Sequence, residues 1–335
     1  MWRRIAGNKR LRPQSTAGNQ DLVDAILSKI DSEVREGSAV RRCARACATF
    51  FLSFTMLGLN GCLKHTRILE RPQEPGVVLS ATAQQLIQRV NTRYDSIHSM
   101  NANVLFQASV GGASKGKVTD YTSLRGYILL RQPSMLRVLG LLPVVETRAF
   151  DMASDGKNFK LLIPPKSEAI VGSGPATTPS ANPLMNLRPG VFYDSLLIKK
   201  ISSNDLVYVT SDTRIVRDPR SHHLMEEPDY DLGILQQQGD SHVLLPVRVI
   251  HVSRIDLMPY QQDEYNDEGI LVTRTLYSNY LTFDHILYPS HIVISRPVDG
   301  YQITLTIEKL TFNHPLDDNQ FQFKIPPGIK IKHLP

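Results

Sequence analysis

The chain has 335 residues, with 38 lysine and arginine residues against 32 aspartate and glutamate residues, which gives a net charge of +6. Ten of these basic residues and five of the acidic ones lie in residues 1–61, so residues 62–335 carry 28 basic and 27 acidic side chains. Because this larger part is almost neutral and shows no basic cluster interleaved with aromatic residues, we expect no nucleic-acid partner.

The first 39 residues combine a basic start with an amphipathic stretch over residues 21–34, whose apolar side chains fall on one helical face. Two interpretations stay open. One is a cytoplasmic extension that is discarded with the signal that follows. The other, which we favour, is a start codon assigned too far upstream, because translation from Val40 would give a leader of ordinary length.

Residues 40–61 have the layout of a secretory leader. Three arginines within residues 41–45 precede an uncharged, largely apolar run over residues 46–59, which is shorter than the roughly 20 apolar residues that span a bilayer. The run ends just before Gly61 and Cys62. This order resembles a bacterial lipoprotein signal. The resemblance implies cleavage between Gly61 and Cys62 and acylation of the Cys62 thiol by palmitate or a similar fatty acid.

The cysteine content supports this interpretation. Cys43 and Cys47 lie inside the leader, so Cys62 is the single cysteine of the remaining chain and cannot form an internal disulfide. The alternative is a short buried helix that ends in a free cysteine. Residues 62–79 contain several charged residues, two prolines and a glycine without sustained apolar periodicity, which predicts a flexible tether.

Residues 80–335 read as one mainly β domain. Ser80 is a plausible N-cap for a helix that extends to about His98, because apolar residues recur there at helical spacing. Residues 102–110 then alternate between apolar and polar, as a half-buried strand does. Further strands are predicted at 125–131, 135–141, 147–152, 159–163, 206–210, 246–255, 271–280, 291–296, 302–312 and 320–325. Short turn-rich loops between them predict an antiparallel sheet.

Two details of this domain can be tested. In residues 302–312 the apolar positions change from odd to even numbers, which predicts a β-bulge at Glu308-Lys309. Residues 171–188 read as a long loop followed by a short helix that begins at Pro183.

The sequence offers no convincing catalytic or metal site. His222 and His223 stand beside acidic residues, but the flanking prolines indicate an exposed loop rather than a metal centre. The acidic run over residues 263–269 lacks the spacing of a calcium loop and reads as a hairpin turn. Since we also find no nucleophile elbow, phosphate-binding loop or zinc-protease helix, we predict no enzymatic activity and no cofactor.

Three segments resemble the LolA/LolB-like superfamily of lipid-binding envelope lipoproteins. They are the paired strands of residues 124–138, the hairpin of residues 150–164, and the closing stretch from residue 312 to 328. The resemblance implies an incompletely closed antiparallel β-barrel of about ten strands. An N-terminal helix and a short helix would cover its concave face.

The same resemblance implies function. We expect a lipid-anchored outer-membrane protein, facing the periplasm, that binds acyl chains, lipids or lipoproteins in an apolar cavity and acts with carriers or assembly proteins in lipoprotein sorting or outer-membrane assembly. Leu139, Leu141 and Leu142 belong to the most apolar run after the leader and are candidates for contact with the membrane or cargo. The alternative is a structural or interaction lipoprotein built on the same domain.

Overall fold

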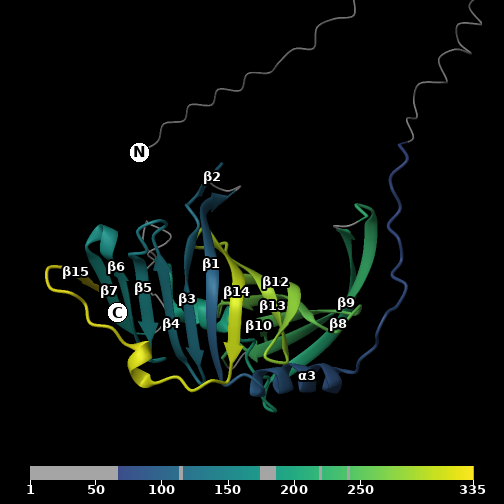
Figure 1. Ribbon diagram of the computed structural model, residues 1–335. Coiled ribbons are helices and arrows are strands. Elements are labelled where there is room, and N and C mark those ends of the chain that lie inside the picture. Colours follow the sequence, from purple (N-terminus) through teal and green to yellow (C-terminus); the bar gives the residue numbers. More distant parts are fainter. Residues whose placement is uncertain (1–66, 113–115, 174–185, 219–220, 240–241, 335) are drawn as a thin grey trace, which may run out of the picture. The chain divides into compact units, whose positions relative to one another are not determined.

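The computed structural model describes residues 67–112, 116–173, 186–218, 221–239 and 242–334 (Figure 1). Residues 71–335 form one compact unit, and residues 1–70 are grouped separately. The predicted lipidation site and the signal that precedes it therefore lie outside the described residues. Within the described residues, no helix is long and apolar enough to cross a membrane.

One large sheet dominates the compact unit. Its order is β15-β7-β6-β5-β4-β3-β1-β14-β13-β12-β11-β10-β9-β8, and β2 pairs with β1 beside this path. The strands are β1 (Ser99–Gly112), β2 (Lys117–Asp120), β3 (Leu124–Arg131), β4 (Met135–Leu141), β5 (Arg148–Ser154), β6 (Asn158–Ile163), β7 (Glu168–Ser173), β8 (Leu206–Arg217), β9 (Leu224–Gln237), β10 (Leu244–Ser253), β11 (Pro259–Tyr265), β12 (Leu271–Phe283), β13 (Ile286–Arg296), β14 (Tyr301–Phe312) and β15 (Lys330–His333).

The sheet confirms the mainly β class and the lack of full closure but corrects the predicted number of strands. It has 15 strands rather than about ten, and β15 and β8 stand at opposite ends of the order, so the sheet is open. Its neighbours pair in antiparallel fashion, as predicted, except that β15 runs parallel to β7.

Three strands account for much of the difference in number. β7 includes residues 171–173, the first three residues of the predicted long loop, which this strand corrects. β9 and β11 occupy segments in which the sequence indicates a loop and a turn. In β9 and β11 polar side chains occupy both faces, so the apolar alternation that marks a half-buried strand is missing.

Helix α3 (Ala83–Asp95) begins slightly after the predicted N-cap, because Thr82 and not Ser80 caps it. The Thr82 hydroxyl accepts a hydrogen bond from the Gln85 backbone amide at 3.3 Å, and the Gln85 side chain accepts one from the Thr82 amide at 2.8 Å. This reciprocal pair satisfies two amides that a helix start leaves unpaired. Leu86 and Val90, one turn apart, are the buried residues of the helix.

Helix α4 (Pro189–Leu196) was not predicted, and the start of the predicted short helix at Pro183 lies outside the described residues. Pro189 stands in its first turn, where the missing amide proton costs nothing. Phe192, Tyr193 and Leu196 are buried against strands of the sheet. We call the sheet face that carries α3 and α4 the inner face, and the opposite one the outer face.

The predicted β-bulge is confirmed. Asn103 of β1 pairs with Lys309 of β14, while the next residue, Val104, pairs with Ile307. Glu308 is therefore the extra residue. The bulge explains why the apolar side chains of β14 change from odd to even positions and still face one core.

The predicted strand at residues 320–325 is wrong. The chain forms a 3₁₀ turn at Asp318–Phe321 and then continues to β15. The aromatic rings of Phe321 and Phe323 instead lie against two arginines of the outer face, with the Arg131 and Arg137 guanidinium carbons 5.2 and 5.9 Å from their ring centres. Cation–π contacts therefore hold this segment in place of ladder hydrogen bonds.

Two clusters of buried apolar residues lie on the inner face. The larger one joins α4 to strands from β1 to β7 and from β12 to β14. The smaller one joins α3 to β9 and β10 through Leu86, Val90, Leu232 and Ile250, with the β10–β11 turn contributing Leu257. The two helices thus cover different parts of one sheet.

Candidate functional site

The central part of the inner face is filled by the chain itself. Phe192 of α4 is 1% exposed and belongs to the larger core. Three polar contacts fix the helix to the sheet: the Ser195 and Thr275 hydroxyls are 2.9 Å apart, the Tyr288 hydroxyl donates to the Leu196 carbonyl at 2.5 Å, and the Gln262 amide donates to the Asp194 carbonyl at 3.1 Å. An acyl chain cannot enter this part unless α4 moves.

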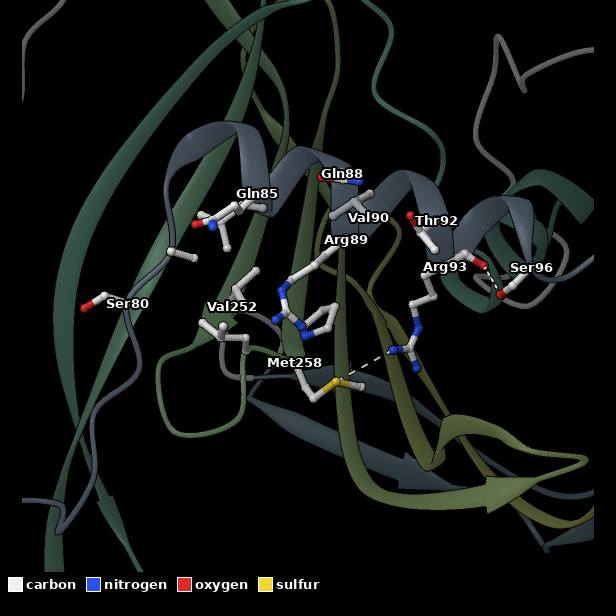
Figure 2. A pocket seen from close by; sticks show the side chains of 14 residues that line it. Ser80, Gln85, Gln88, Arg89, Val90, Thr92, Arg93, Ser96, Val252 and Met258 are labelled. Carbon is white, nitrogen blue, oxygen red and sulfur yellow. Dashed lines mark hydrogen bonds between the residues drawn. The ribbon is translucent and has the colours of Figure 1, made fainter.

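An open groove of about 550 Å³ lies between α3 and the β10–β11 turn (Figure 2). This volume is typical of small-molecule sites, which range over about 300–1,000 Å³. The apolar lining consists of Ala81, Leu86, Val90, Val252, Leu257, Met258 and Pro259. Leu86 and Val90 are almost fully buried, whereas Ala81 and Met258 are only partly buried and offer side-chain surface to a ligand.

The rest of the groove lining is polar and carries only positive charge. Arg89 and Arg93 project from α3 toward Met258 in Figure 2. The remaining lining residues are uncharged: Ser80, Gln85, Gln88, Thr92 and Ser96. None of the described aspartate or glutamate residues lines this groove. The site therefore combines an apolar floor with a cationic wall.

Two other cavities on the inner face have a different chemistry. They measure about 510 and 710 Å³ and share Asp194, Lys199 and Glu264 in their linings. Lys199 and Asp194 form an ion pair at 2.9 Å, and Arg248 donates to the Lys199 carbonyl at 2.9 Å. Charged groups this close together suit a polar ligand better than an acyl chain.

Glu264 titrates near neutral pH. Desolvation by burial, together with the negative charge of Asp194, raises the pKa of Glu264 to about 7, and Lys199 and Arg248 oppose this shift only in part. Because the folded protein then holds a proton that the unfolded chain releases near pH 4.5, its stability falls as the pH rises from there through about 7.

Replacement of Glu264 by glutamine is expected to remove this pH dependence. Relative to Glu264→Gln, the wild type should lose stability between pH 5 and pH 8, because ionised Glu264 is desolvated beside Asp194. Urea unfolding of both proteins at the two pH values measures the effect. Glu168→Gln on β7 is the matched control. Parallel pH profiles of wild type and Glu264→Gln would contradict the raised pKa.

The residues proposed from the sequence lie in different places. Cys62 and Gly61 fall outside the described residues. Leu139 and Leu141 are on the outer face of β4, because they alternate with Val138, which lies in the inner core. Leu142 follows in the β4–β5 turn and is partly buried.

The tip of the β4–β5 turn is formed by valines. Val144 is 99% exposed and Val145 is 63% exposed, so they and not the leucines protrude furthest into solvent. Their apolar side chains keep the turn a candidate for contact with a membrane, although the protruding residues differ from those expected.

The histidine pair stands at the β8–β9 turn. His222 and His223 are exposed, and His223 directly precedes β9. Across the described residues, no group of three or more histidine, cysteine or acidic side chains could hold a metal ion.

Sequence reasoning missed the α3 groove. Its residues come from positions 80–96 and 252–259, which only the folded chain brings together. The one local signal is the pair Arg89 and Arg93, four residues apart and hence on one helical face. Such a pair is also common on ordinary exposed helices, so it could not mark a site by itself.

Comparison with solved structures shows similar folds. A LolA superfamily protein from Nitrosomonas europaea matches with a TM-score of 0.46 and 15% identity over 73% of this chain and 99% of that chain. A DUF1329 family protein from Desulfovibrio piger gives 0.41 and 15% over 72% and 95%. A putative outer membrane lipoprotein-sorting protein domain from Vibrio parahaemolyticus gives 0.41 and 13% over 72% and 97%.

No family model and no curated protein matches the sequence. The likeness to these solved structures is partial, with TM-scores of 0.41–0.46. At identities of 13–15% this likeness concerns the fold alone.

Proposed function

We propose that this protein is a lipid-anchored envelope lipoprotein that binds an acyl chain in the α3 groove and acts in lipoprotein sorting or outer-membrane assembly. The observation that carries the proposal is the groove itself, an open space of about 550 Å³ with an apolar floor. Each buried CH₂ group contributes about 0.8 kcal/mol, so such a floor can bind an acyl chain without catalytic groups.

The path of the chain supports a link between anchor and groove. The Gln73 amide donates to the Leu224 carbonyl at 2.8 Å, and the Leu79 amide donates to the Arg254 carbonyl at 2.7 Å, so the end of the predicted tether is fixed on the sheet. Ser80 then enters the groove lining.

A larger side chain at Ala81 tests the proposal. Ala81→Trp should fill the groove and reduce co-purifying acyl lipid at least about fivefold, because Ala81 is partly buried in its lining. The mutation preserves the backbone amide of Ala81, which donates to the Tyr230 hydroxyl at 3.2 Å. Mass spectrometry of the gently extracted chain carrying Cys62→Ser measures the bound lipid.

The control is Val118→Trp on the exposed strand β2, which should leave lipid content unchanged. Equal lipid content in the Ala81→Trp protein and the wild type would contradict the groove as the binding site.

One observation favours a second function. Because α4 fills the central inner face, the domain could instead serve as a structural or interaction module beneath the outer membrane. The end strand β8, with 12 residues, pairs with β9 and presents its other edge for pairing with a partner strand. Absence of co-purifying lipid from both the wild type and Ala81→Trp would favour this function.

A further inference from the structure

The cationic wall of the α3 groove faces a lining without carboxylates, as far as the described residues go. Arg89 and Arg93 lie four residues apart on α3. Like charges at this spacing destabilise a helix. A negatively charged group placed between them would remove this repulsion, which indicates that the groove suits an anionic ligand.

Arg93 is held in place by contacts with the protein, whereas Arg89 is not. The Arg93 guanidinium donates to the Leu287 carbonyl, lies 3.8 Å from the Met258 sulfur and sits 5.4 Å from the centre of the Tyr280 ring. These contacts fix its position at one end of the groove. Arg89 makes no hydrogen bond or ion pair with the described residues, and its side chain projects into the groove (Figure 2).

The acyl-chain site and the arginines share one space. Met258 contacts Arg93 and also belongs to the apolar lining. A ligand whose chain lies on this floor would therefore bring its polar end within reach of the guanidinium groups. A guanidinium has five N–H donors in a planar fork, which suits the oxygens of a phosphate.

We propose that the groove binds an anionic phospholipid, with the acyl chain on the apolar floor and the phosphate held by Arg89 and Arg93. This inference rests on the proposed acyl-chain function and adds the class of headgroup. Arg93 positions the phosphate from a fixed place, and Arg89 moves to complete the contact. Neutral lipids of the same chain length lack the group that these side chains recognise.

Calorimetric titration of the full chain carrying Cys62→Ser tests this inference. Three probes are compared: lauroyl lysophosphatidylglycerol and monolauroylglycerol, each below its critical micelle concentration, and inorganic phosphate. The anionic lipid should bind at least about tenfold more tightly than the neutral one, a factor that corresponds to 1.4 kcal/mol. Higher salt should reduce this preference because the groove is open to solvent.

Arg89→Gln should bring the two lipids to within about threefold, since glutamine retains helix propensity but loses the charge. Arg89→Lys should restore part of the preference, because lysine supplies charge without the planar fork. Lys117→Gln on the exposed strand β2 is the charge-matched control and should change nothing.

The outcomes separate the two proposals. Equal binding of both lipids, unaffected by Arg89→Gln, would overturn the phosphate recognition and leave acyl-chain binding intact. Binding of inorganic phosphate as tight as that of the anionic lipid would also overturn it, because the chain would then contribute nothing. Binding of none of the three probes would overturn the acyl-chain function together with this inference.

Discussion

Replacement of Phe192 by alanine is expected to lower the free energy of unfolding by about 3–5 kcal/mol, the usual cost of truncating a buried aromatic residue. Phe192 is 1% exposed and is the largest fully buried side chain of the described residues. It connects α4 to the core of the inner face, so its loss leaves a cavity where helix and sheet meet. Urea unfolding at pH 7 measures the change.

Gly190→Ala in the same helix is the matched control. A β-carbon at Gly190 would have no neighbour within 4 Å, and alanine favours a helix over glycine by about 1 kcal/mol, so this variant should be slightly more stable than the wild type. A loss below about 1 kcal/mol for Phe192→Ala would mean that α4 is not packed on the sheet. The inner face would then be open to cargo.

Replacement of Cys62 by serine is expected to abolish incorporation of palmitate and to release the protein from the membrane fraction. Serine keeps the size of the side chain but removes the thiol that an acyl chain would modify. Stable anchoring needs more than one acyl chain, because a single chain binds a membrane only marginally. Full release of the protein therefore requires that all of its acyl chains depend on Cys62. Metabolic labelling followed by fractionation measures both effects.

Cys47→Ser provides the comparison, because Cys47 lies in the part that the proposed cleavage removes. This variant should label like the wild type. Palmitate incorporation that persists in Cys62→Ser and disappears in Cys47→Ser would place the modification inside the predicted leader and contradict the proposed anchor.

Much of the sheet follows from local patterns in the sequence. The predicted bounds of residues 135–141 match β4, in which burial alternates because Leu136 and Val138 lie in the core while Arg137 lies on the outer face. The bulge at Glu308 was predictable for the same reason, since a phase change in apolar positions is visible without any knowledge of the partner strand.

Strand β11 was not predicted, because its sequence lacks an apolar pattern. In β11, Gln262 is buried on the inner face against α4, while Asp263 is buried on the outer face against Arg274 at 2.6 Å. Hydrogen bonds and ion pairs, rather than apolar burial, satisfy both faces of this strand. A consecutive polar run of this kind reads as a turn, because its partners come from distant segments.

The candidate site was less predictable than the fold. The sequence pointed to Leu139, Leu141 and Leu142 as contacts for a membrane or cargo, which stays a prediction, and it gave no sign of the α3 groove. The groove arises because α3 lies across the turn that precedes Pro259, an arrangement set by packing of Leu86 and Val90 on β9 and β10. A local sequence pattern does not predict where a helix packs on a sheet.

The most direct measurement of where an acyl chain binds is photo-crosslinking with a lipid that carries a diazirine in its acyl chain, followed by mapping of the modified peptides. Binding in the α3 groove predicts adducts on residues 80–96 and 252–259, with labelling strongly reduced in Ala81→Trp. Adducts concentrated on residues 189–196 or on the outer face of β4, unchanged by Ala81→Trp, would contradict the groove as the site of acyl-chain binding.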